Sequence, residues 1–135
     1  MSVIVLARML AGAVLAVAAG MAPAADGTRP GDPKNGEAIY ARCLACHALA
    51  YDRTGPRHCG LFGRRAGSVK DFGYSEAMKH SKIVWTEKTL DHFLANPLAA
   101  IPGTAMGYAG VTDAKERADL IIYLKQANRS PSCRK

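Results

Sequence analysis

The sequence predicts a small all-α protein with a single domain. Several segments place apolar residues three and four positions apart, which is the period of an amphipathic helix. No segment alternates apolar and polar residues for long enough to predict a strand. The chain has 135 residues, 49% of them hydrophobic, so it can bury one core but lacks room for a second domain of ordinary size.

Residues 1–25 have the composition of an export signal. They contain one base, Arg8, and no acid, and an apolar run extends over residues 9–19. Small residues follow, so we expect cleavage after Ala24 or Ala25, leaving residues 26–135 as the folded domain. The alternative is an uncleaved membrane anchor, although the run is shorter than the roughly 20 residues that a spanning helix needs.

The first and last predicted helices have clear start signals. Asp32 can cap a helix with Pro33 at its first position, and Asp113 can cap the last helix. The face of the first helix is formed by Gly36, Ile39, Tyr40 and Cys43. The apolar stripe of the last helix is formed by Leu120, Tyr123, Leu124 and Ala127. The glycine in the first helix would let another backbone approach closely.

Two shorter helices are predicted between these. Ser75 can cap a helix over residues 76–79, and Thr86 can cap another that Asn96 and Pro97 end. Residues 48–71 are rich in Gly and Arg and show little periodicity. Because so long a loop is unusual in a compact domain, we expect a large flat cofactor to organise it.

The chemistry is concentrated in residues 43–47, Cys-Leu-Ala-Cys-His. The spacing C-x-x-C-H is the signature of c-type haem attachment. The thiols of Cys43 and Cys46 would form thioethers with one haem edge, and His47 would supply an imidazole nitrogen to the iron. A thioredoxin-like site would need a preceding strand, and a zinc site would need a second cysteine pair, which the separate Cys59 and Cys133 do not provide. We therefore expect one covalently bound haem c.

The second axial position of the iron has several candidate ligands: His58, His80, His92, Met78 and Met106. Met106 is favoured because it follows Ile101-Pro102-Gly103-Thr104-Ala105, a segment that Pro and Gly keep out of a helix and that can wrap a haem face. Met78 is more typical of core filling. His80 and His92 are more typical of exposed helix positions.

The charge favours a protein partner. Lys and Arg number 18 against 11 acids, and removal of Arg8 with the signal leaves 17 against 11, a net charge of +6. The bases are scattered and form no basic helix with interleaved aromatics, so we exclude a nucleic acid as partner. An acidic protein surface suits this charge.

The sequence resembles class I c-type cytochromes of the mitochondrial and alphaproteobacterial type. The resemblance is collinear over nearly all of residues 26–135. It covers residues 31–47, 54–56, 60–64, 72–75, 85–97, 101–106, 109–110 and 116–125. It implies the all-α cytochrome c fold, with helices and loops wrapped around one covalently bound haem.

The resemblance also implies roles for single residues. The carbonyl of Pro56 would accept a hydrogen bond from the ring of His47. Arg64, Tyr74 and Trp85 would hold or neutralise the inner propionate. In addition, Thr104 would seat the haem near Met106, and Gly36 and Tyr40 would pack against Leu120 and Tyr123.

The sequence departs from the mitochondrial pattern near the predicted methionine ligand. Phe93 stands where those proteins have a tyrosine, and Met78 where they have an asparagine, so this side is less polar. Leu98, Ala99 and Ala105 replace lysines that surround the haem edge. A docking mode driven by a ring of lysines is therefore not expected.

The resemblance implies a soluble monohaem carrier in the periplasm, moving single electrons between redox complexes. Donors would be a quinol–cytochrome c reductase or a dehydrogenase, and acceptors an oxidase or a photosynthetic reaction centre. We expect a monomer that converts no small-molecule substrate. Two alternatives are a haem enzyme or gas sensor with an open sixth position, and a membrane-tethered module.

Cys59 and Cys133 are outside the family pattern. Haem attachment at Cys43 and Cys46 leaves these two thiols, an even number in an oxidising compartment. The family fold brings the end of the last helix near the loop that holds Cys59, so the resemblance implies that a disulfide can form. The alternatives are two free thiols or, remotely, Cys59 as an iron ligand.

Overall fold

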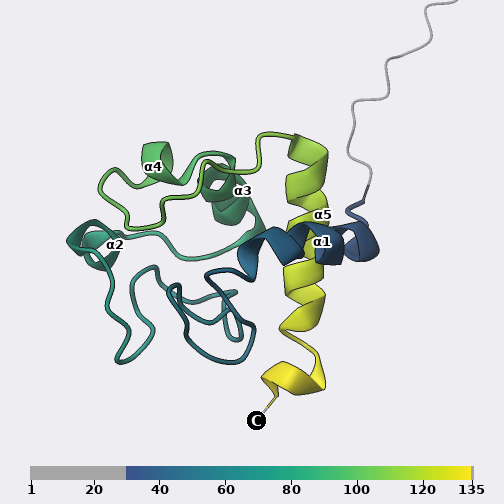
Figure 1. The fold of residues 1–135 in the computed structure, drawn as a ribbon, viewed down its shortest axis with the longest axis horizontal. Helices are drawn as coiled ribbons and strands as arrows, with labels where there is room; N and C mark the ends of the chain where they lie inside the picture. Colours follow the sequence, from purple (N-terminus) through teal and green to yellow (C-terminus); the bar gives the residue numbers. More distant parts are fainter. Residues whose placement is uncertain (1–29, 135) are drawn as a thin grey trace, which may run out of the picture.

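The first and last helices cross each other and support one side of the molecule. The computed structural model describes residues 30–134. Helix α1 (Pro33–Tyr40) lies across α5 (Ala114–Ala127) (Figure 1). The predicted caps are present: the side chain of Asp32 accepts a hydrogen bond from the Lys34 N–H, and that of Asp113 accepts one from the Glu116 N–H. Both helix starts are therefore confirmed.

The crossing depends on a direct approach of the two backbones. A Cβ atom at Gly36 would overlap the carbonyl oxygen of Asp119 in α5, which confirms the close approach expected at this glycine. Beside it, the rings of Tyr40 and Tyr123 lie 5.2 Å apart between centroids. Leu120, buried at 1% exposure, completes the predicted contact.

Asp119 is a buried carboxylate that the sequence analysis missed. It is 1% exposed and accepts hydrogen bonds from the backbone N–H of Asp32 and the amide of Asn35, both at 2.7 Å. It also forms an ion pair with Lys115. Although burial opposes ionisation, these donors hold the pKa of Asp119 below its ordinary value. The carboxylate thus links the start of α1 to α5.

Three further helices lie to the left of α1 and α5 in Figure 1, and one of them, α3, packs against α5. They are α2 (Glu76–His80), α3 (Glu87–Ala95) and α4 (Pro97–Ala100). Ser75 and Thr86 cap α2 and α3 as predicted, and the predicted face of α3 is buried at Leu90, Phe93 and Leu94. Helix α4 was not predicted: Asn96 ends α3 and at once caps a new turn with Pro97 at its first position.

The ends of the long helices are tighter than predicted. α1 continues as a 3₁₀ turn over Ala41–Cys43 rather than as α-helix, and a second 3₁₀ turn, Pro131–Cys133, follows α5. Residues 48–71 contain no helix, as expected. Within residues 30–134 the only β-pairing is an isolated bridge between Arg65 and Val84, so the all-α prediction is confirmed.

The predicted signal, residues 1–25, lies outside the described residues. Among residues 30–134, no helix combines the length and the apolar character needed to cross a membrane.

Candidate functional site

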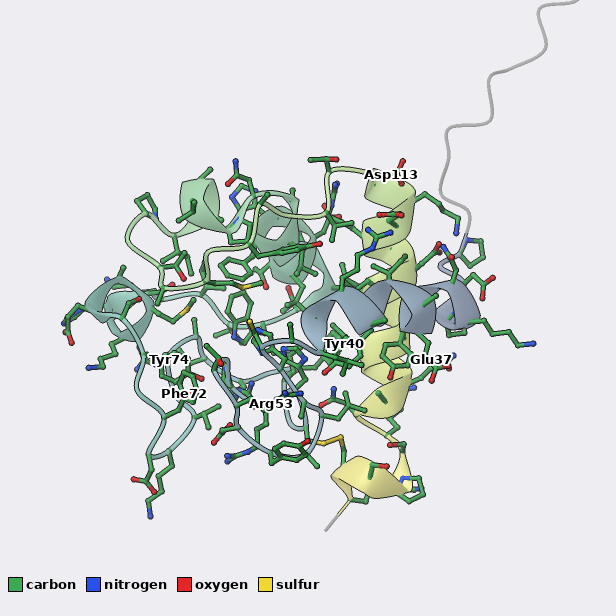
Figure 2. The ribbon with its side chains drawn as sticks, viewed as in Figure 1. Glu37, Tyr40, Arg53, Phe72, Tyr74 and Asp113 are labelled. Atoms are coloured by element: carbon green, nitrogen blue, oxygen red, sulfur yellow. A yellow bond between two sulfur atoms is a disulfide. The ribbon has the colours of Figure 1, made fainter. Side chains whose placement is uncertain are left out.

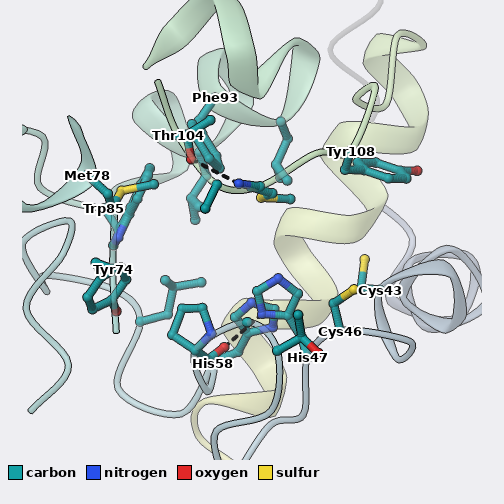
Figure 3. A pocket seen from close by; sticks show the side chains of 18 of the residues that line it. Cys43, Cys46, His47, His58, Tyr74, Met78, Trp85, Phe93, Thr104 and Tyr108 are labelled. Atoms are coloured by element: carbon teal, nitrogen blue, oxygen red, sulfur yellow. Dashed lines mark hydrogen bonds between the residues drawn. The ribbon is translucent and has the colours of Figure 1, made fainter. Parts of the chain in front are cut away.

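The structure has a largely apolar cavity of about 470 Å³ (Figure 3). The 43–47 segment lies on one side of it, and α3 and the loop after α4 lie on the other. Figure 3 shows Cys43, Cys46 and His47 on one side, and Thr104, Phe93 and Trp85 on another. The volume is within the range of about 300–1,000 Å³ that ligand sites occupy. Most of the predicted site residues line this cavity; they are Cys43, Cys46, His47, Pro56, Arg64, Tyr74, Trp85, Thr104 and Met106.

Local winding of the chain brings both thiols and His47 to one edge of the cavity. The carbonyl of Cys43 accepts hydrogen bonds from the N–H groups of Cys46, at 3.0 Å, and His47, at 2.8 Å. Neither Cys43 nor Cys46 forms a disulfide. Cys43 is half-buried, which raises the pKa of its thiol, whereas Cys46 is exposed. The two sulfur atoms are therefore available for attachment to one ligand.

The imidazole of His47 is held as a metal ligand would be. Its Nδ1 lies 2.8 Å from the Pro56 carbonyl oxygen, to which it donates, so Nε2 keeps its lone pair. A Cβ atom at Gly55 would overlap the His47 ring at Cε1, so this glycine backbone lies directly against the ring. Burial lowers the pKa of His47, with the Pro56 carbonyl acting in the opposite direction. The ring is thus prepared to coordinate in its neutral form.

Met106 reaches the same cavity from the loop after α4. This loop turns at Gly103, whose φ of +88° is in the left-handed region, and the Thr104 N–H donates to the Ile101 carbonyl. The Met106 N–H then donates to the hydroxyl of Thr104 at 3.3 Å. Nearby, Trp85 and Phe93 pack with ring centroids 5.0 Å apart, in agreement with an apolar environment on this side.

Arg64 presents a donor that has no partner in the cavity. Its Nη1 and Nη2 donate to the backbone carbonyls of Cys59 and Arg57, at 3.0 and 2.9 Å. Its Nε is buried without a hydrogen-bond partner among the described residues. Burial lowers the pKa of Arg64. Because buried donors are normally satisfied, this nitrogen is suited to an acidic group of a bound ligand.

Among the candidate iron ligands, His80 and His92 are exposed and do not line the cavity. Met78 is buried in the core cluster, as expected of core filling, and also lines the cavity. His58 lies in the cavity on the same side as His47 (Figure 3). Its ring stacks on that of His47 at 4.4 Å.

Burial, together with the charges of His47 and Arg64, lowers the pKa of His58 to about 3. The sequence offered no sign of this arrangement beyond the presence of a histidine near Pro56.

Cys59 and Cys133 are paired in the structure, with their Cα atoms 5.1 Å apart (Figure 2). The C-terminal turn therefore contacts the loop that follows Pro56. The side chain of Asn128 accepts a hydrogen bond from the Leu61 N–H at 3.0 Å, which joins the end of α5 to the same loop.

These features fit a haem group. The free thiols and the neutral imidazole suit covalent attachment and iron ligation, the apolar walls suit a porphyrin, and the Arg64 donor suits a propionate. A small all-α fold built around such a cavity defines the class of c-type haem proteins.

Comparison with known proteins gives the family. The cytochrome c family model matches residues 33–128. Cytochrome c2 of Blastochloris viridis is 41% identical over 128 residues, covering 93% of this chain and 98% of its own. Cytochrome c of Ginkgo biloba is 44% identical over 102 residues, covering 73% of this chain and 90% of its own. The structure of cytochrome cH from Methylobacterium extorquens aligns with a TM-score of 0.69 at 37% identity, covering 71% of this chain and 99% of that one.

The chain belongs to the cytochrome c family and is a class I c-type cytochrome. It carries one covalently attached haem c and acts as a monohaem electron carrier, as the sequence analysis predicted.

Proposed function

We propose that this cytochrome is a soluble periplasmic carrier whose haem is attached at Cys43 and Cys46 and ligated by His47 and Met106. The bound haem supplies a one-electron ferric–ferrous couple. The observation that carries the proposal is the setting of His47, whose Nδ1 is engaged by the Pro56 carbonyl at the edge where both thiols lie. This contact fixes the tautomer that coordinates through Nε2.

Met106 is proposed as the second axial ligand because it lines the cavity in a loop fastened by the Thr104 hydroxyl. A thioether favours the ferrous state relative to a second imidazole. A ligand held in both oxidation states keeps rearrangement small during electron transfer. Arg64, Tyr74 and Trp85 are proposed to surround the inner propionate, with the Arg64 Nε as the donor that remains for it.

An occupied sixth position also separates a carrier from an enzyme or gas sensor, which needs an open one. The test is exposure of the purified ferrous protein to carbon monoxide. A carrier with Met106 bound should show no change in its absorption spectrum, whereas rapid formation of a carbon monoxide complex would favour the sensor or enzyme. The Met106→Ala variant is the positive control for an open site.

Export is proposed from residues 1–25, with cleavage after Ala24 or Ala25. The alignment with cytochrome c2 covers 93% of this chain, so it extends into residues 1–25. Cell fractionation followed by N-terminal sequencing tests this proposal. A mature protein that begins at Ala25 or Asp26 in the periplasmic fraction supports it, and an intact N-terminus in the membrane fraction would establish the tethered alternative.

The partners are proposed to be redox proteins, including membrane complexes, with acidic docking surfaces. Leu98, Ala99 and Ala105 are exposed and give the methionine side an apolar rim. Arg42 forms two hydrogen bonds of 2.8 Å with Glu116, which places an opposite charge beside this base. Both features weaken charge-driven docking.

Electron-transfer rates with an acidic partner should therefore fall with ionic strength, but less steeply than those of a lysine-ringed cytochrome. Stopped-flow measurements with the same partner would show this difference. Equal slopes for the two cytochromes would contradict the docking proposal.

A further inference from the structure

His58 lines the cavity, yet the resemblance gives it no role. It lies on the same side of the cavity as His47, and Thr104 and Phe93 lie across from both (Figure 3). A residue in this place cannot replace Met106 on the opposite face of a haem. What it can do is act on His47.

The position of His58 is fixed from two directions. Its backbone N–H is shared by the carbonyls of Ala48 and Leu49, both at 3.1 Å, in the segment directly after His47. Its ring Nδ1 lies 3.0 Å from the hydroxyl of Tyr40. Tyr40 is itself only 3% exposed and belongs to α1. The ring of His58 is thereby tied to the crossing of α1 and α5.

The ring of His58 covers one face of the His47 ring. The two centroids are 4.4 Å apart and the planes are inclined by 22°, which is contact distance for nearly parallel rings. Two other contacts hold His47: the Pro56 carbonyl accepts from Nδ1, and the Gly55 backbone lies against the ring at Cε1. Contact with the face adds a restraint on ring tilt and rotation that a hydrogen bond to one nitrogen leaves open.

We propose that His58, held by the Tyr40 hydroxyl, is a positioning residue that fixes the plane of the His47 imidazole. The inference rests on the proposed ligation of the iron by His47. Groups around a ligating histidine set its orientation and thereby tune the metal. An aliphatic side chain at position 58 would fill similar space but would offer neither a flat surface to His47 nor a nitrogen to Tyr40.

The test compares four variants of the haem-loaded protein: His58→Leu, His58→Phe, Tyr40→Phe and His92→Leu. His58→Leu removes the flat ring and the nitrogen, His58→Phe removes only the nitrogen, and Tyr40→Phe removes only the hydroxyl. His92→Leu is the matched control, because His92 is exposed on α3. The readouts are the electron paramagnetic resonance g-values of the ferric protein, which depend on the plane of the axial imidazole, and the reduction potential.

His58→Leu should shift the g-values and the potential. His58→Phe keeps a flat ring, so its g-values should lie much closer to those of the wild type. Tyr40→Phe and His58→Phe both lose the bond between these two side chains and should broaden the signals, and His92→Leu should match the wild type. Wild-type g-values and potential in His58→Leu, or an equal shift in His58→Phe, would overturn the proposal. A wild-type spectrum of Tyr40→Phe would also overturn it, and this outcome can be measured even if His58→Leu does not mature.

Failure of this inference can be distinguished from failure of the proposed function. The wild-type protein alone shows whether a histidine and a methionine ligate the iron, whatever the variants at position 58 do.

Discussion

Loss of the Cys59–Cys133 bond should lower the free energy of unfolding by up to about 4.5 kcal/mol. The bond joins residues 74 positions apart, and this figure is what the chain-entropy model gives for a closed loop of that length at 25 °C. It is an upper value, because other links between the C-terminal turn and the loop persist after reduction. One of them is the hydrogen bond from the Leu61 N–H to Asn128.

The perturbation is Cys133→Ser, compared with the double variant Cys59→Ser/Cys133→Ser. Guanidinium unfolding of the ferric protein, followed by tryptophan fluorescence, should show the midpoint falling by up to roughly 1 M. Both variants should lose the same amount, since either one removes the cross-link. Both variants keep the backbone carbonyl of residue 59, which accepts a hydrogen bond from Arg64.

Mass spectrometry of unfolded, non-reduced wild-type protein supplies the covalent evidence. No alkylation before reduction and two added groups after it would establish the bond. Two groups added without reductant, or an unfolding midpoint that Cys133→Ser leaves unchanged, would refute the reasoning.

Two further predictions concern the crossing of α1 and α5. Gly36→Ala should destabilise the protein by about 1–3 kcal/mol, because the new Cβ overlaps the Asp119 carbonyl. Gly73 has open space around it, so Gly73→Ala should have little effect in the same denaturation assay. Equal effects of the two substitutions would contradict the close approach of the helices. Asp119 has a lowered pKa, so its contribution to stability is present above about pH 4 and is lost as the pH falls further. Asp119→Asn should remove that part of the acid dependence, and an unchanged profile would contradict it.

Helix starts were predictable because each depends on a short local pattern. Each of these helices is preceded by a residue with a short polar side chain: Asp32, Ser75, Thr86 or Asp113. Capping involves only that residue and the first turn, so the capping roles follow from sequence alone. Helix α4 was missed because Asn96 was interpreted only as an end to α3. It also caps the next turn, which a stop signal does not reveal.

The residues that were missed at the site and the core depend on contacts between distant segments. Asp119 resembles an ordinary polar position of an exposed helix until Asp32 and Asn35 are brought against it. His58 was considered only as an iron ligand, and its contact with the His47 ring needs both ends of the 47–58 loop in place. The attachment motif was predictable because the chemistry requires all three of its residues within one turn.

The proposed ligation by His47 and Met106 is tested most directly by the absorption spectrum of the ferric protein. A thioether bound to ferric haem gives a weak sulfur-to-iron charge-transfer band. We expect the band in the wild type, its loss in Met106→Ala, and carbon monoxide binding to the ferrous form of that variant only. A band that persists unchanged in Met106→Ala would contradict the account.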